Sequence, residues 1–290
     1  MNTEIIRGYY NQDALRGSFN QLARQTFDGL DFEAWYRDGY WSECYDPHSI
    51  VIDGKVVANV SVNFMDFFWN GQRKHFIQLG TVMTAEGFRN QGLIRQIMDG
   101  IEEEFGQKAD GIYLFANDSV LDFYPKFGFK KVMEHCYTKP FSIPEGSSAI
   151  RISMQEQGER KRLEDAMRRS VSYSRFRMVD NDNLIFFYLT GPLRDCVYYD
   201  CRHDAYVIAQ IEKEVLTVHD IFSEKKYPVD DILAAFGRGI RLVRFGFTPI
   251  DAEGCEVEAY REEDCTLFVK GTELEDFEKD KVIFPTLSHA

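Results

Sequence analysis

The spacing of apolar and polar positions changes several times along the first half of the chain, and each change predicts a new element. Apolar residues at helical spacing predict helices over 15–27, 31–40, 91–105 and 119–126. Alternating or short apolar runs, with Asp-Gly and Asn-Gly hairpin turns, predict strands over 4–9, 49–53, 55–69, 73–84, 111–116 and 127–135. This order predicts a mixed, mostly antiparallel α+β sheet flanked by helices.

The second half repeats the first in outline. Its patterns predict helices over 156–174 and 228–238 and strands over 184–188, 195–200, 205–212, 214–223 and 239–247. Both halves contain a long strand, a crossover helix and a strand in which apolar and polar residues alternate. This order indicates an internal repeat in which the pattern and spacing recur but the residues are not identical. The stretch FSIPEGSSA after Pro140 predicts a linker. We therefore expect two domains, 1–142 and 149–290.

Composition narrows the classes of partner. The formal net charge of −13 repels phosphate backbones and argues against nucleic acid as a partner. It would attract a cationic small molecule, although solubility explains the same charge. No apolar run approaches roughly 18 residues and the N-terminus has no signal-like apolar core, so we expect a cytoplasmic chain without a membrane span. The cysteines form no CxxC pair, so we expect reduced thiols and no metal; they are Cys44, Cys136, Cys196, Cys201, Cys255 and Cys265.

The segment 82–95 has the character of an anion-binding turn. A strand ends, the chain turns, and an amphipathic helix begins in a stretch bracketed by Arg89 and Arg95. Gly92 allows the backbone to approach a ligand closely. The unpaired N–H groups of a first helical turn, with the positive end of the helix dipole, can bind a pyrophosphate. Taken alone, Gly92 is equally well explained as a residue that relieves a tight turn.

The order of elements, the helix start RNQGLIRQIM and the later stretch FYPKFGFKKV resemble the GCN5-related N-acetyltransferase (GNAT) superfamily. Its members hold the pyrophosphate of acetyl-CoA with an Arg/Gln-x-x-Gly-x-Gly/Ala loop. That loop matches Arg89, Asn90, Gln91, Gly92, Leu93 and Ile94. A large aliphatic residue at the last position, followed by Arg95, resembles the branch typified by the enhanced-intracellular-survival (Eis) aminoglycoside acetyltransferases. The specific motifs lie within residues 1–140, and the second half is similar only in outline.

The resemblance implies roles for further residues. Val82, Met83 and Thr84 would offer backbone groups to the pantetheine arm, and Asn117 would hydrogen-bond the same arm. A helix cap or Asx-turn is the alternative for Asn117. Tyr124 matches the tyrosine that returns a proton to the departing CoA thiolate, a role that suits a phenol protonated at neutral pH. The alternative for Tyr124 is an aromatic residue of the core.

The general base is less well defined by the sequence. In the branch named above, the C-terminal carboxylate has this role, which corresponds to Ala290 here. Asp66 and Glu33 are alternatives suggested by expected proximity alone. The histidines His75, His135 and His289 are expected to be surface or structural residues. In the second repeat, the stretch beginning at Ser223 has no glycine and carries Glu224, so its cofactor site is expected to be lost.

These expectations define an acetyl-CoA-dependent N-acetyltransferase built of two tandem GNAT folds, the second degenerate. Acetyl-CoA is the expected co-substrate, with no metal, and the acceptor is expected to be a primary amine of a small cationic molecule. The alternative is a catalytically silent acyl-CoA-binding regulator, because fold alone does not prove activity. The sequence does not determine the oligomeric state, and a homo-oligomer is compatible with it.

Overall fold

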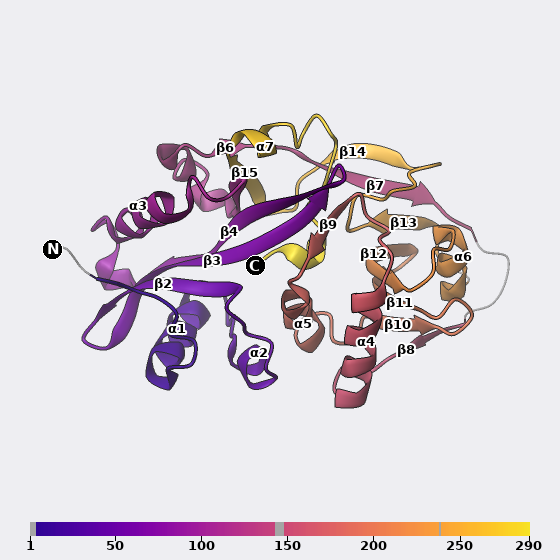
Figure 1. The fold of residues 1–290 in the computed structure, drawn as a ribbon, viewed down its shortest axis with the longest axis horizontal. Coiled ribbons are helices and arrows are strands. Elements are labelled where there is room, and N and C mark those ends of the chain that lie inside the picture. The colour runs from indigo at the N-terminus through magenta and orange to yellow at the C-terminus, as the bar shows by residue number, and fades with distance from the viewer. Residues whose placement is uncertain (1–3, 143–147, 238) are drawn as a thin grey trace.

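A computed structural model describes residues 4–142, 148–237 and 239–290, and it contains two mixed β-sheets with helices packed on their faces (Figure 1). This is the α+β class that the sequence predicts. Most of the predicted linker FSIPEGSSA, residues 143–147, lies outside the described residues. None of the helices in the described ranges has the length and apolar run needed to cross a membrane.

The first sheet carries the motif-bearing strands. Its order within the described chain is β1-β2-β3-β4-β5-β15-β6, and β9 pairs with the end of β3. All neighbours are antiparallel except β4 and β5, which are parallel. The strands are β1 Ile5–Ile6, β2 Tyr45–Ile52, β3 Lys55–Trp69, β4 Gln72–Thr84, β5 Gly111–Ala116, β6 Lys130–Lys131, β9 Phe176–Val179 and β15 Thr266–Lys270.

The second sheet has the order β14-β7-β13-β12-β11-β10-β8 in the part of the chain described here. Its parallel pair is β12 and β13, the counterpart of β4 and β5. The strands are β7 Glu134–Pro140, β8 Ala149–Arg151, β10 Val197–Asp200, β11 Ala205–Glu212, β12 Val215–Ser223, β13 Leu242–Phe245 and β14 Glu256–Tyr260.

The two sheets exchange one strand each. β7 comes from the first half of the chain but pairs with β13 in the second sheet. β15 comes from the second half but pairs with β5 in the first sheet. The exchanged strands occupy equivalent places, each antiparallel to the second strand of the parallel pair. We propose that the two repeats correspond to residues 1–142 and 149–290, although each repeat contributes one strand to the other repeat's sheet.

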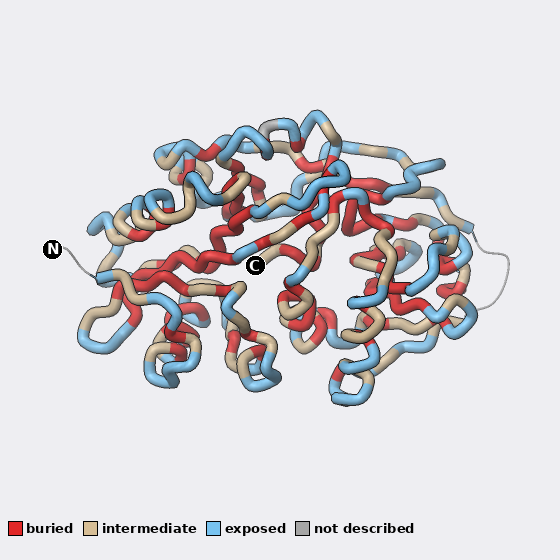
Figure 2. Tube along the Cα trace, in the orientation of Figure 1, coloured by how far each residue is buried: buried red, intermediate tan, exposed pale blue. Residues whose placement is uncertain are grey.

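Each sheet is covered on both faces. α1 packs on one face of the first sheet through Phe19 and Leu22, and α3 covers the other through Ile97 and Ile101. α4 and α6 cover the two faces of the second sheet in the same way. Figure 2 shows the resulting buried layer between exposed helical surfaces. The helices are α1 Asp13–Thr26, α2 Glu33–Arg37, α3 Leu93–Phe105, α4 Gln157–Arg169, α5 Asp182–Thr190, α6 Val229–Leu233 and α7 Thr272–Glu275.

The structure corrects three of the predicted elements. The apolar run 184–188 is not a strand but lies within α5, which is buried on several sides because it packs between clusters from both halves. The predicted helix 119–126 is two short 3₁₀ turns, η2 Asp118–Val120 and η3 Tyr124–Phe127, and Pro125 disfavours α-helix before it. The predicted strand 127–135 divides into β6 and the start of β7, which lie in different sheets.

Candidate active site

A bulge in β4 prepares the site. Ser61 pairs with Gly80 and Asn59 pairs with Met83, so β4 has extra residues opposite Val60. One of them, Thr81, has a φ of 47°, in the left-handed region that a β-branched residue rarely adopts. The buried Asn59 side chain donates from Nδ2 to the Thr81 carbonyl oxygen at 2.9 Å and stabilises this conformation.

Beyond the bulge, β4 separates from β5. The two strands pair only from Phe76 to Leu79 on β4, although β4 continues to Thr84 and β5 to Ala116. On its other edge β4 still pairs with β3, where Thr84 faces Ala58. The backbone of Val82, Met83 and Thr84 on the β5 side is therefore available to an extended ligand entering the opening between the two strands.

The predicted anion-binding turn has the expected geometry. The 3₁₀ turn η1, Glu86–Phe88, leads into a loop in which Asn90 and Gly92 have φ values of 61° and 78°. Gly92 is the N-cap of α3, and no side chain caps this helix end. The first N–H groups of α3 therefore have no intrahelical acceptor and point from an exposed loop with the positive end of the helix dipole.

A groove connects this loop with the opening between β4 and β5. All ten of the predicted cofactor-contacting residues in 82–84 and 89–95 line it, together with Asn117 and Tyr124. Arg95 lies over the ring of Phe127, with its guanidinium carbon 4.8 Å from the ring centroid. Arg89 is exposed at the mouth of the groove, where its charge can meet a phosphate. The groove is thus lined by two arginines and the exposed start of α3, together with apolar side chains and the carboxylates of Asp28 and Asp264.

Tyr124 lies where this groove meets a second cavity, and it lines both. It is 5% exposed and its ring packs against Phe129 and Phe268, so it also belongs to the core. Burial raises the pKa of Tyr124 to about 12, so the hydroxyl keeps its proton at neutral pH. The residue can therefore serve both as a packing element and as a proton donor.

Asn117 follows β5 and also borders both hollows. Its side chain does not cap the following 3₁₀ turn. Instead, its Nδ2 donates to the carboxylate of Asp264 at 2.7 Å, and the backbone N–H of Asp118 donates to the same carboxylate at 2.6 Å. Asn117 therefore links the end of β5 to the loop before β15.

The second cavity is walled mainly by aromatic rings. Its lining includes Phe32 and Trp35 from the start of α2, Tyr45 of β2, Phe115 of β5, and Phe187 and Tyr188 of α5. Among the described residues that line it, none is an aspartate or glutamate. It shares Phe27, Val82, Asn117 and Tyr124 with the cofactor groove, so the two hollows are continuous. A thioester in the groove would face an aromatic chamber.

Ala290 lies inside this chamber. The C-terminal segment runs between the two halves and ends near the centre of the molecule, beside β3 and β4 (Figure 1). Gln78 donates from Nε2 to the Ala290 oxygen at 3.2 Å. Gly80 is required beside it, because a Cβ there would lie 2.9 Å from the Ala290 carbonyl carbon. The β4 bulge and the end of the sequence are therefore packed against each other.

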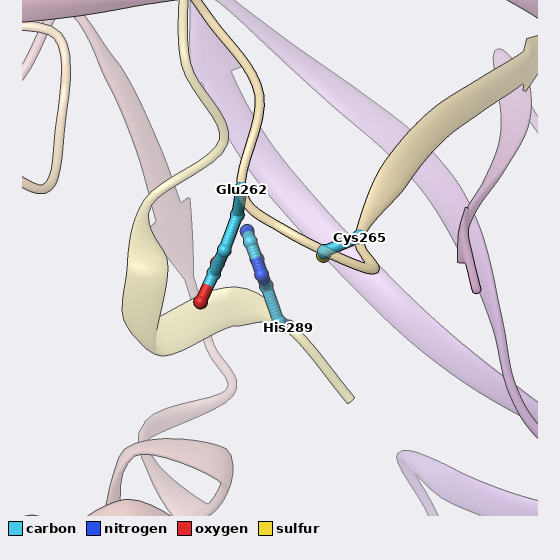
Figure 3. A group of neighbouring side chains, drawn as sticks. All are labelled: Glu262, Cys265 and His289. Carbon is cyan, nitrogen blue, oxygen red and sulfur yellow. The ribbon is translucent and has the colours of Figure 1, made fainter. Parts of the chain in front are cut away.

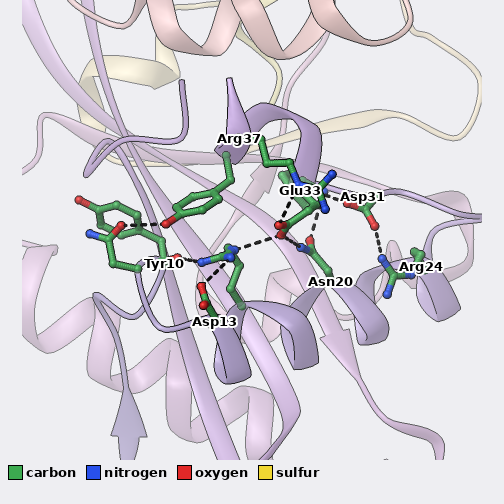
Figure 4. Close-up of polar contacts among 11 residues, drawn as sticks. Tyr10, Asp13, Asn20, Arg24, Asp31, Glu33 and Arg37 are labelled. Carbon is green, nitrogen blue, oxygen red and sulfur yellow. Dashed lines mark hydrogen bonds and ion pairs between the residues drawn. The ribbon is translucent and has the colours of Figure 1, made fainter. Parts of the chain in front are cut away.

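The other candidate bases lie in ion pairs and do not line the chamber. Glu33 forms ion pairs with Arg16 at 3.0 Å and Arg37 at 3.4 Å, within the network of Figure 4. Asp66 pairs with Arg73 and with His75 on the exposed hairpin of β3 and β4. His289 lines the chamber together with Ala290.

The equivalent opening in the second half is filled by the chain itself. β12 and β13 pair only as far as Val218, and the 3₁₀ turn η5, Thr286–Ser288, enters the space beyond. The Thr286 N–H donates to the Gly246 carbonyl at 2.8 Å, and its hydroxyl lies 2.8 Å from Nδ1 of the buried His219. α6 has only five residues and begins after Pro228 without a glycine turn. The sequence predicts that the second half has lost its cofactor site, and the C-terminal segment occupies the corresponding space.

Comparison with known proteins finds a family model that matches part of the chain. Residues 14–129 match the model of the Acetyltransferase (GNAT) family. GNAT enzymes are acyltransferases that use acetyl-CoA. The matched residues contain the complete groove loop and Tyr124. Comparison of the sequence with curated proteins gave no match.

Solved structures share the whole fold, at low identity. A probable N-acyltransferase from Enterococcus faecalis V583 is 16% identical, with a TM-score of 0.59 over 96% of this chain and 74% of that one. A GCN5-related N-acetyltransferase from Kribbella flavida is 17% identical, with a TM-score of 0.56 over 92% and 71%. Eis1 from Mycobacterium abscessus is 11% identical, with a TM-score of 0.56 over 92% and 73%. At these identities the likeness concerns the fold, and it extends over both sheets.

Proposed function

We propose that this chain transfers the acetyl group of acetyl-CoA to the primary amine of a small molecule. The observation that carries the proposal is the junction of the cofactor groove with the aromatic chamber, which meet at Tyr124. The amine nitrogen attacks the thioester carbonyl, the amide bond forms, and the carbon–sulfur bond breaks. The departing CoA thiolate takes the proton of Tyr124, and a base accepts the proton released by the amine.

The main-chain carboxylate of Ala290 is the base in this proposal. In a chain that ends at Ala290, it is the one carboxylate that the described lining of the chamber contains. Gln78 hydrogen-bonds the Ala290 oxygen, and Gly80 leaves room for Ala290 on the chamber wall. The carboxylate would also attract the acceptor in its ammonium form before it takes the proton, directly or through water. Tyr124 regains its proton from solvent after CoA leaves.

The acceptor proposed here is an amine with an apolar body. Aromatic rings attract an ammonium group through their faces and favour apolar surface around it. A polycationic acceptor would need several carboxylates, and the described chamber lining offers the terminal carboxylate only. The overall acidic charge of the chain can still concentrate cations near the surface.

We expect arylalkyl monoamines to be better acceptors than aminoglycosides or polyamines. The kcat/KM for phenethylamine or tryptamine should exceed that for spermidine or an aminoglycoside by about tenfold or more, from burial of roughly one ring in the chamber. Release of free CoA thiol from acetyl-CoA measures this. Equal rates for all amines of the panel would contradict the inference that the aromatic chamber walls select an apolar acceptor. Binding of acetyl-CoA without turnover of any amine would favour a silent acyl-CoA-binding protein instead.

Acetyl-CoA is expected to bind once per chain, and Gly92→Asp is expected to abolish binding. The substitution adds a carboxylate at a helix N-terminus that must receive a pyrophosphate, and it also strains a φ of 78°. Gly71→Asp is the matched control, because Gly71 has a φ of 77° and equally open surroundings in a hairpin away from the groove.

Calorimetric titration measures both expectations. Wild type and Gly71→Asp should bind with a stoichiometry near one, and Gly92→Asp should show at least a hundredfold weaker Kd, from charge repulsion and lost phosphate contacts. A stoichiometry near two would contradict the filled second opening. Equal affinity of the two variants would contradict the assignment of the 89–95 loop.

A further inference from the structure

Three side chains with metal-ligating atoms converge on the wall of the aromatic chamber. They are Glu262, Cys265 and His289, and one ligand-type atom from each lies within 4.8 Å of the others (Figure 3). Cys265 and His289 also line the chamber. The sequence pattern alone does not indicate this group, because Glu262 and His289 are far apart and the cysteines follow no common zinc pattern.

Two of the three residues lie in one tight turn. The Cys265 N–H donates to the Glu262 carbonyl oxygen at 3.2 Å, and the two residues form an isolated antiparallel bridge. Their spacing, with two residues between, is the spacing by which a turn presents two ligands to one metal ion. Asp264, with a φ of 56°, is fixed by Asn117 and Asp118, so the end of β5 holds the turn in place.

The third residue has an unsatisfied buried nitrogen. The ring of His289 stacks on Phe115 with 3.9 Å between centroids. Its Nε2 is fully buried and has no hydrogen-bond partner among the described residues. An unpartnered buried nitrogen costs free energy unless it binds something, and a neutral imidazole nitrogen is a metal ligand.

No basic side chain neutralises the exposed carboxylate of this group. Glu262 forms no ion pair with a lysine or arginine in the part of the chain that the structure describes. Its negative charge is therefore available to a cation.

We propose that Glu262, Cys265 and His289 bind one Zn²⁺ or a similar first-row transition cation, with a remaining coordination position open to the chamber. A thiolate, a neutral imidazole and a carboxylate are a donor set that suits zinc, and three protein ligands leave room for water or an incoming group. On binding, the sulfur–proton bond of Cys265 breaks, a sulfur–metal bond forms, and the proton passes to solvent. The thiolate and carboxylate together neutralise the divalent charge.

The site has a structural consequence for the chamber. His289 precedes Ala290, and the turn 262–265 precedes β15, the strand received from the second half. A cation bound here ties the end of the sequence to the exchanged strand. The proposal does not depend on acetyl transfer, since it concerns the three ligands and their environment.

Metal titration of the full-length chain tests the site. After treatment with a chelator, wild type should bind one Zn²⁺ per chain by calorimetry. Co²⁺ should give the near-ultraviolet charge-transfer band of a thiolate ligand. Affinity should rise with pH through the neutral range, because the Cys265 thiol loses its proton on binding.

The variants separate ligands from neighbours. Cys265→Ser should lose the Co²⁺ band, and both Cys265→Ser and Glu262→Gln should weaken Zn²⁺ binding at least tenfold. Glu263→Gln, in the same turn, and Cys201→Ser, an exposed cysteine, should bind within about twofold of wild type. Glu262 is exposed, so Glu262→Gln should keep the metal-free melting temperature, and Zn²⁺ should raise that temperature in wild type and in the two control variants but less in Glu262→Gln. Equal Zn²⁺ binding by Cys265→Ser and Cys201→Ser, or a Co²⁺ spectrum without a thiolate band, would overturn the proposal.

Discussion

Tyr124→Phe is expected to lower kcat by roughly 10²–10⁴-fold while the Kd of acetyl-CoA changes little. The ring packs against Phe129 and Phe268, and phenylalanine preserves this packing. Only the hydroxyl at the junction of groove and chamber is lost. Because the pKa of Tyr124 is raised to about 12, wild type should show no alkaline loss of activity between about pH 7 and 10 from this group.

Tyr206→Phe is the matched control for this experiment. Tyr206 is a buried tyrosine of β11 in the second sheet and lines neither the groove nor the chamber. Its substitution should leave kcat within about twofold. A Tyr124→Phe enzyme that keeps wild-type kcat would make Tyr124 a core aromatic only. A drop in melting temperature together with kcat would assign the hydroxyl a structural role.

Adding one glycine after Ala290 is expected to lower kcat by about 10²-fold without weakening acetyl-CoA binding. The extension moves the carboxylate by up to about 3.5 Å from the position beside Gln78 and Gly80. Ala290→Gly keeps the carboxylate in place and should retain activity within a few-fold. Gly80→Ala should act like the extension, because its Cβ would displace Ala290.

Intact-protein mass spectrometry establishes where each variant ends, and steady-state kinetics with a saturating amine gives kcat. Full activity of the extended chain would exclude the terminal carboxylate as the base. Loss of activity in Ala290→Gly as well would indicate that the methyl group, and not the carboxylate, matters at this position.

The local part of the site could be predicted from the sequence. Arg89 to Gly92 form the loop that leads into α3, and the left-handed φ of Gly92 is a local property that a glycine before an amphipathic helix indicates. The hairpins at Asp53 and Asn70 follow from turn residues in the same way, and both have a positive φ. These features depend on residues a few positions apart.

The long-range part could not be predicted. The strand exchange of β7 and β15 joins residues more than a hundred positions apart, and neither strand's pattern records its partner. The sequence pattern of α5 predicts a strand. Because the helix is packed on several sides, its apolar residues do not follow the helical spacing of an amphipathic helix. The group of Glu262, Cys265 and His289 likewise exists only after the C-terminal segment folds back against β15.

The central claim is that an acetyl group moves from acetyl-CoA to an amine where the groove meets the chamber. Mass spectrometry of the small molecules after incubation with acetyl-CoA and an arylalkyl amine tests it most directly. We predict the mono-acetylated amide and one equivalent of free CoA per amide with wild type, and neither product above background with Gly92→Asp. CoA release without any acetylated amine, or equal amide from both proteins, would contradict the claim.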